Sequence, residues 1–97
     1  MAVVQITVVP LGTGEPSLSA YVKQVLAVLD EHPEVKAHVG PNGTSLEGDL
    51  EELWPLLREM HEKPFAAGVQ RVWTLLSVDD RRDRPLSIRG KLEAVGK

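Results

Sequence analysis

The chain has 97 residues, of which 42% are hydrophobic and 26% charged, with a formal net charge of −3 and no cysteine. This size and balance predict one globular domain and argue against disorder, and the lack of cysteine excludes disulfides, thiolate metal sites and a cysteine nucleophile. An acidic chain has no global attraction for nucleic acid, and its apolar start is too short to cross a bilayer and carries no basic leader. We therefore expect a cytoplasmic protein that binds neither nucleic acid nor a membrane.

The first part of the chain predicts a strand, a helix and a second strand. Ala2–Pro10 is rich in β-branched residues and ends at a turn signal, as expected of a strand. From about Pro16 to Glu31, apolar residues recur at helical spacing, and His32-Pro33 ends the pattern. Residues 35–39 then alternate apolar and polar side chains, which indicates a second strand.

The second part predicts a hairpin partner, a helix, a long strand and a short helix. Turn residues 40–43 lead into a strand at Thr44–Gly48, and a fourth strand is expected at Val69–Asp79, followed by a helix from about Pro85 to Val95. Between them Asp49 caps a helix that Pro55 should kink and whose end is marked by Pro64 and Gly68. The inner face of this helix is expected to consist of Leu50, Leu53, Trp54, Leu57, Met60 and His61.

The order β-α-β-β-α-β over residues 1–97 predicts an α+β domain of ferredoxin-like topology. Its antiparallel sheet should carry two helices on one face, with a short C-terminal helix added. The other face would keep Val3, Val9, Trp73 and Leu75, an apolar surface that either the C-terminal helix or further copies of the chain must cover. We therefore expect a homodimer or homotetramer assembled through the sheets.

Four motifs occur in the order and spacing of a known family. They are Pro10–Thr13 with Ser17–Val22, the hairpin Gly43–Gly48, the start of the last strand at Gly68–Val72, and the charged turn Asp79–Asp83. Over nearly the whole chain they resemble the small thiamine-binding protein family, also called UPF0045. The resemblance implies a ferredoxin-like fold, dimers or tetramers formed through the sheets, and binding of thiamine or its hydroxymethylpyrimidine part. It implies no enzymatic activity and no cofactor.

Six residues are candidates for binding such a ligand: Thr13, Ser17, Ser19, Thr44, Glu47 and Trp54. Ser17 and Ser19 open the first helix, where hydroxyls and free N–H groups can hold a polar ligand, although Ser17 as a simple helix cap is the alternative. Trp54 offers a flat face for stacking, with packing as its commoner role.

The hairpin supplies two further candidates, Thr44 and Glu47. Glu47 can accept a hydrogen bond from an aminopyrimidine or attract a thiazolium ring, while a surface salt bridge is the usual role of a strand glutamate. Thr44 lies three positions away from Glu47, so the two face opposite sides unless a bulge intervenes.

No other pattern predicts catalysis or a metal site. His32, His38 and His61 do not match a metal-binding spacing, and neither a catalytic triad nor a phosphate-binding glycine motif is present. The balanced charges of residues 79–84 favour ion pairs over a phosphate site. A scaffold oligomer without a ligand remains an alternative. An acylphosphatase-like enzyme is disfavoured, because its early loop needs an arginine and the first basic residue here is Lys23.

Overall fold

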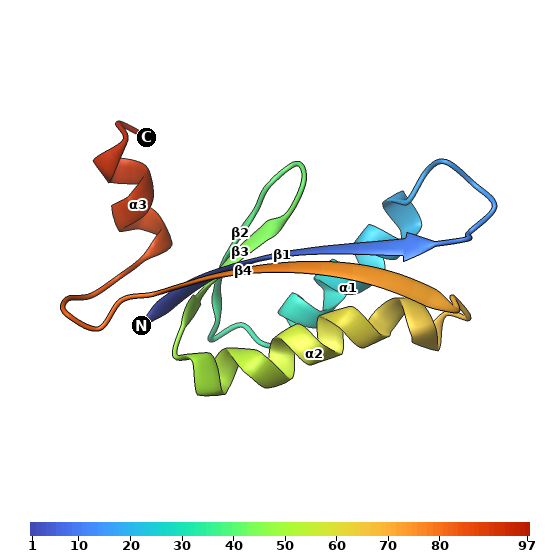
Figure 1. Ribbon diagram of the computed structural model, residues 1–97, viewed down its shortest axis with the longest axis horizontal. Helices are drawn as coiled ribbons and strands as arrows, with labels where there is room; N and C mark the ends of the chain where they lie inside the picture. The colour runs from blue at the N-terminus through green and yellow to red at the C-terminus, as the bar shows by residue number, and fades with distance from the viewer.

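A computed structural model describes all 97 residues and shows one four-stranded antiparallel sheet with three helices (Figure 1). The elements in chain order are β1 (Ala2–Leu11), α1 (Ser19–Asp30), β2 (Lys36–Val39), β3 (Thr44–Gly48), α2 (Leu50–Ala66), β4 (Arg71–Asp80) and α3 (Ile88–Ala94). The strand order is β2-β3-β1-β4, and both long helices, α1 and α2, lie on the same face of the sheet. The expected ferredoxin-like α+β fold is therefore confirmed. None of the helices has the length and apolar character needed to cross a membrane.

The core lies between the sheet and the two long helices. Alternation along β1 turns Val4 and Ile6 toward the helices, and Leu46 of β3 lies beside Val4 in the antiparallel register. The buried hydrophobic cluster consists of Val4, Ile6, Val25, Val28, Leu46, Leu53, Leu56, Leu57 and Met60. Nine buried side chains make a small core, as expected for a chain of this length.

Helix α1 begins later than the sequence predicts. Leu18, and not Pro16 or Ser17, occupies the N-cap position, and its carbonyl accepts the first helical hydrogen bond from Val22 at 3.0 Å. Pro16 and Ser17 lie in the loop that precedes the helix, which also contains Gly12 and Gly14 with φ of 72° and 78°. The expected start at Pro16 is therefore wrong by three residues.

Helix α2 is rotated relative to the predicted inner face. Leu56 is 2% exposed and belongs to the core, whereas Trp54 is 47% exposed and His61 is half-buried. The reason is that α2 packs against α1 as well as against the sheet, so its buried stripe is shifted toward α1. The helix continues through Pro55 and Pro64 and ends at Ala66, between Pro64 and Gly68, where the sequence predicts its exit.

The rotation of α2 can be tested with a matched pair of alanine variants. We expect Leu56→Ala to lower the free energy of unfolding by about 2–5 kcal/mol, because it opens a cavity in the core. Trp54→Ala should cost about 1 kcal/mol or less, because this side chain is half in solvent. Urea denaturation followed by circular dichroism measures both, and a larger loss for Trp54→Ala would contradict the packing of α2.

Candidate functional site

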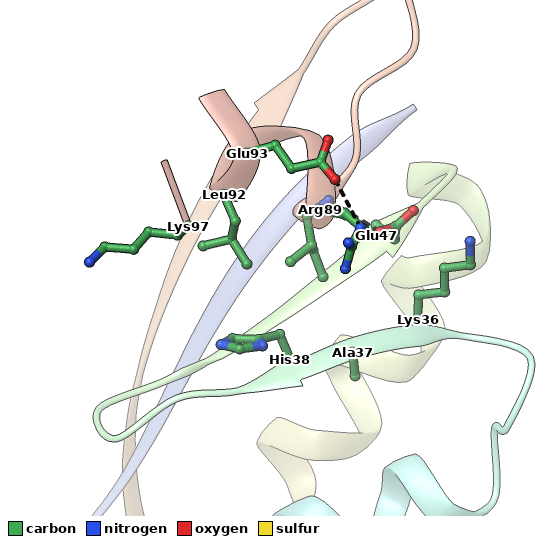
Figure 2. Close-up of a pocket in the computed structure, with 9 residues that line it drawn as sticks. Lys36, Ala37, His38, Glu47, Arg89, Leu92, Glu93 and Lys97 are labelled. Carbon is green, nitrogen blue, oxygen red and sulfur yellow. Dashed lines mark hydrogen bonds and ion pairs between the residues drawn. The ribbon is translucent and has the colours of Figure 1, made fainter. Parts of the chain in front are cut away.

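A cleft lies between the open face of the sheet and α3 (Figure 2). Its floor is formed by Lys36 and His38 of β2 and by Glu47 of β3, whose side chains point away from the two long helices. Ile88 and Leu92 of α3 contribute apolar groups to its wall. The cleft has a volume of about 250 Å³. It is therefore a mixed polar and apolar site on the sheet face that α1 and α2 leave uncovered.

Glu47 is the group that joins the floor of this cleft to its wall. Its Oε1 accepts a hydrogen bond from the backbone N–H of Ile88 at 3.1 Å, across 41 residues of sequence. The β1–β3 register runs without a bulge from Val3↔Glu47 to Ile6↔Thr44, so Glu47 faces the cleft while Thr44 is buried on the opposite face. The prediction that Thr44 and Glu47 face opposite sides is confirmed.

Polar contacts hold α3 in place over the sheet. Ser87 caps the helix by accepting a hydrogen bond from the N–H of Gly90 at 2.9 Å, and Lys91 pairs with Asp79 of β4. Within the helix, Arg89 and Glu93 form an ion pair at 2.9 Å. No residue of α3 is buried, so this wall of the cleft has little apolar anchorage.

The serine-bearing entrance of α1 lies at the other end of β1. Glu47 pairs with Val3, whereas the loop to α1 follows Leu11, and eight strand residues span about 26 Å (Figure 1). At that end the hydroxyls of Ser17 and Ser19 lie 3.0 Å apart, within hydrogen-bonding distance, and neither caps the helix. One chain therefore does not bring these serines and Glu47 together.

The remaining candidates are also separated from the cleft. Thr13 lines a different cavity, formed with Tyr21 and Arg71 at the end of β1, and its hydroxyl donates a hydrogen bond to the carbonyl of Glu15 at 3.0 Å. Trp54 lies on the helix side, in a shallow groove beside β4. Of the six residues predicted from the sequence, Glu47 is the one that lies under α3.

Sequence reasoning missed most of the cleft. Lys36 and His38 gave no signal beyond strand alternation, and their place beside Glu47 follows from the β2–β3 register. The spacing of Ile88 and Leu92 predicted a helix, but nothing in the sequence placed that helix over Glu47.

The charged turn after β4 forms ion pairs, as its balanced composition predicted. Arg81 donates two hydrogen bonds to the carboxylate of Asp83, at 2.6 and 2.9 Å, and Arg82 pairs with Asp80 at 3.0 Å. The hydrogen bonds from Arg81 hold the pKa of Asp83 below its ordinary value, and the pKa of Arg81 is raised in turn. Arg81 and Arg82 are therefore already paired with carboxylates of the same turn.

The fold and the cleft define a single-sheet α+β protein of ferredoxin-like topology with a site of small-molecule size. The chain belongs to the thiamine-binding protein family, whose model matches residues 4–96. It is 38% identical to UPF0045 protein YqgV of Bacillus subtilis, over all of this chain and 96% of that protein.

Two solved structures have the same fold. Hypothetical protein MJ1052 of Methanocaldococcus jannaschii is 36% identical, with a TM-score of 0.86 over 98% of this chain and 95% of that one. A Thermotoga maritima protein provisionally assigned to thiamine biosynthesis or salvage has a TM-score of 0.79 over 97% of both chains. It is 22% identical, so this likeness shows the fold alone.

Packing explains the glycine of the Gly43-Thr44 pair in the hairpin motif. A Cβ atom at Gly43 would lie 2.8 Å from both Gln5 Nε2 and Thr7 Oγ1, and 3.3 Å from the carbonyl oxygen of Ile6. These distances are shorter than van der Waals contact, so the turn could not approach β1 as closely with a larger residue.

We expect Gly43→Ala to lower the free energy of unfolding by about 1–3 kcal/mol through overpacking. Ser45→Ala, a change on the open face of the same hairpin, should alter it by less than about 0.5 kcal/mol. Thermal and urea unfolding of the two variants provide the comparison, and an unchanged stability for Gly43→Ala would show that the hairpin is not packed this tightly.

Proposed function

We propose that this chain binds thiamine or its hydroxymethylpyrimidine part in the cleft under α3, and that it catalyses no reaction. The observation that carries the proposal is the position of Glu47: the carboxylate of the hairpin through which the sequence resembles this family lines the cleft.

Glu47 has the chemistry that an aminopyrimidine ring requires. A carboxylate accepts hydrogen bonds from the exocyclic amino group or from a protonated ring nitrogen, and such charge-assisted bonds are the strong ones. Its Oε1 already accepts from the N–H of Ile88, while Oε2 makes no hydrogen bond within the chain. A ligand amino group can therefore bind at Oε2 without displacing α3.

The neighbours of Glu47 favour the pyrimidine over the thiazolium ring at this position. Lys36 is the cross-strand partner of Glu47, so a cationic ring would compete with an ammonium group for the same carboxylate. Ile88 and Leu92 offer the apolar contact that a flat ring needs.

The size of the cleft also favours one ring. A volume of about 250 Å³ lies just below the range of roughly 300–1,000 Å³ that is typical of drug-sized ligands. A shift of α3, which buries no residue, would widen the cleft for whole thiamine.

Removing the negative charge of Glu47 tests whether the ligand binds in this cleft. Glu47→Gln keeps an acceptor for the N–H of Ile88 and loses the negative charge, so α3 should stay docked. We expect it to weaken binding of hydroxymethylpyrimidine and thiamine tenfold or more, because hydrogen bonds to a charged group contribute about 1.5–3 kcal/mol. Isothermal titration calorimetry measures the affinities.

Glu62→Gln provides the matched control, because Glu62 is exposed on α2 and lines neither the cleft nor the core. Equal affinities for Glu47→Gln and the unchanged chain would place the ligand elsewhere. If millimolar thiamine and hydroxymethylpyrimidine neither bind to the unchanged chain nor raise its unfolding temperature, the proposed function fails, since a ligand of the native state must stabilise it.

We further propose that copies of the chain associate through β4 and the open face beside it. Trp73 is 61% exposed and Leu75 58% exposed, although α3 covers another part of the same face. In the sheet β4 pairs with β1 alone, so the outer edge of this ten-residue strand is unpaired. Long apolar edge strands in stable proteins are usually covered.

The expected self-association depends on Trp73. We expect the unchanged chain to be a dimer or tetramer, and Trp73→Lys to shift it to monomers, because an ammonium group would have to be buried at the contact. Light scattering coupled to gel filtration gives the masses. Trp54→Lys, on the helix side, should leave the assembly intact, and a monomeric unchanged chain at tens of micromolar would overturn the proposal.

A further inference from the structure

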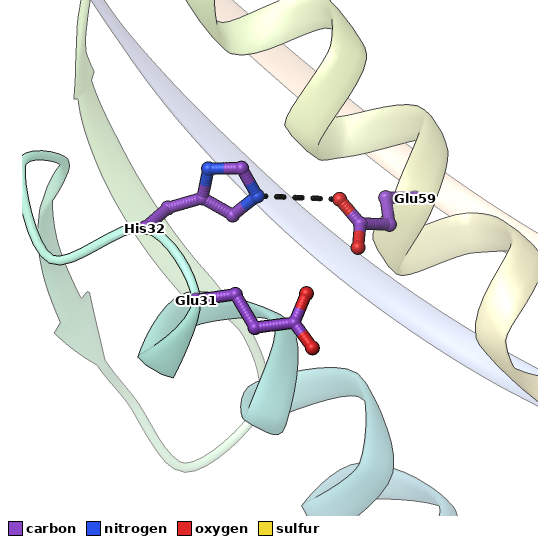
Figure 3. A group of neighbouring side chains, drawn as sticks. All are labelled: Glu31, His32 and Glu59. Carbon is purple, nitrogen blue, oxygen red and sulfur yellow. Dashed lines mark hydrogen bonds and ion pairs between the residues drawn. The ribbon is translucent and has the colours of Figure 1, made fainter.

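The C-terminal end of α1 lies against the middle of α2, and an imidazole and two carboxylates meet there (Figure 3). Glu31 is the C-cap residue of α1. His32 follows it, and the backbone N–H of His32 donates a hydrogen bond to the carbonyl of Leu29 at 3.0 Å. Glu59 projects toward them from α2. One ligand atom from each of Glu31, His32 and Glu59 lies within 4.8 Å of the others.

Both nitrogens of the His32 ring face carboxylates. Nε2 lies 3.3 Å from Oε2 of Glu59, and Nδ1 lies 3.4 Å from Oε1 of Glu34. Two ligands of a tetrahedral zinc ion, with bonds of about 2.1 Å, are about 3.4 Å apart. The separation between His32 Nε2 and Glu59 Oε2 is therefore already that of two ligands of one ion.

We propose that His32, Glu59 and Glu31 bind a divalent first-row transition metal ion such as Zn²⁺. The donor set is mixed: the imidazole suits zinc and its neighbours, while the carboxylates add charge, and magnesium or calcium would instead prefer oxygen ligands throughout. Three protein ligands leave a position for water. Glu31 is exposed on a long side chain, so it can move the remaining distance to the ion.

Glu34 lies on the other side of the His32 ring and would hold the ring in place for the ion. A histidine that binds a metal commonly donates its other ring N–H to a carboxylate, which fixes the tautomer and the orientation of the ring. Glu34 lies at Nδ1, so the lone pair of Nε2 is left to point at Glu59 and the proposed ion.

The local charge favours a cation. No lysine or arginine forms an ion pair with Glu31, Glu34 or Glu59. The C-terminal end of α1 adds the negative end of a helix dipole.

The site is also accessible. A cavity of about 550 Å³ lies along this side of the molecule and is lined by His32, Glu34 and Glu59. An ion can enter through it, and water can complete the coordination. Once bound, the ion would link the end of α1 to the middle of α2 and stabilise the packed helix pair.

Titration of the untagged chain with Zn²⁺ tests the proposal. We expect one ion per chain by calorimetry, a higher unfolding temperature with Zn²⁺, and no comparable effect of Mg²⁺. His32→Gln and Glu59→Gln should each bind Zn²⁺ at least tenfold more weakly. His38→Gln is the matched control, because His38 lies on the open face of the sheet, and it should bind as the unchanged chain does.

A measurement on the unchanged chain tests the site even if the variants fail to fold. In ¹H–¹⁵N spectra of the histidine rings, Zn²⁺ should shift Nε2 of His32 and leave the rings of His38 and His61 unchanged. Equal Zn²⁺ affinity in His32→Gln, a shift confined to another histidine, or no binding at micromolar Zn²⁺ would each overturn the proposal. The thiamine site is tested separately, since Glu47→Gln should retain the metal.

Discussion

Both strand–helix–strand crossovers of this chain pass over the same face of the sheet, so a single layer of side chains must supply nearly all of its buried apolar surface. Val4, Ile6 and Leu46 meet the two long helices there. The opposite face receives only α3, and it keeps both the polar group of the candidate ligand site, Glu47, and the exposed Trp73. The face covered by the helices therefore holds the core, and the opposite face holds the groups that are free to contact a ligand or another chain.

Periodicity in the sequence predicted every helix and strand, because an alternating or helical apolar pattern is a local property of the chain. It did not predict how far α2 is rotated. Both Trp54 and Leu56 lie near the apolar stripe, and the choice between them depends on α1, which packs against one side of α2. The predicted start of α1 was also wrong: a proline suits a first turn, but Pro16 lies in the loop and the helix begins at Ser19.

The candidate site was predicted in part. Strand alternation placed Thr44 and Glu47 on opposite faces, and the unbroken register agrees. The helix entrance at Ser17 could not be placed relative to Glu47, because that distance depends on the full length of β1. The contact between Glu47 and Ile88, like that between His32 and Glu59, joins elements that are far apart in sequence and carry no shared motif. Such contacts follow from the fold and not from local pattern.

The weak anchorage of α3 connects the cleft to the rest of the open face. Glu47 accepts from Ile88 at the start of this helix, and Lys91 binds Asp79 further along it, yet no residue of α3 is buried. Elements with few buried apolar contacts open at low cost in free energy. A ligand that contacts both Glu47 and Leu92 would therefore order α3 as it binds, and part of its interaction energy would be spent on that ordering. A neighbouring copy that packs against α3 would reduce this cost, so self-association and ligand affinity would increase together.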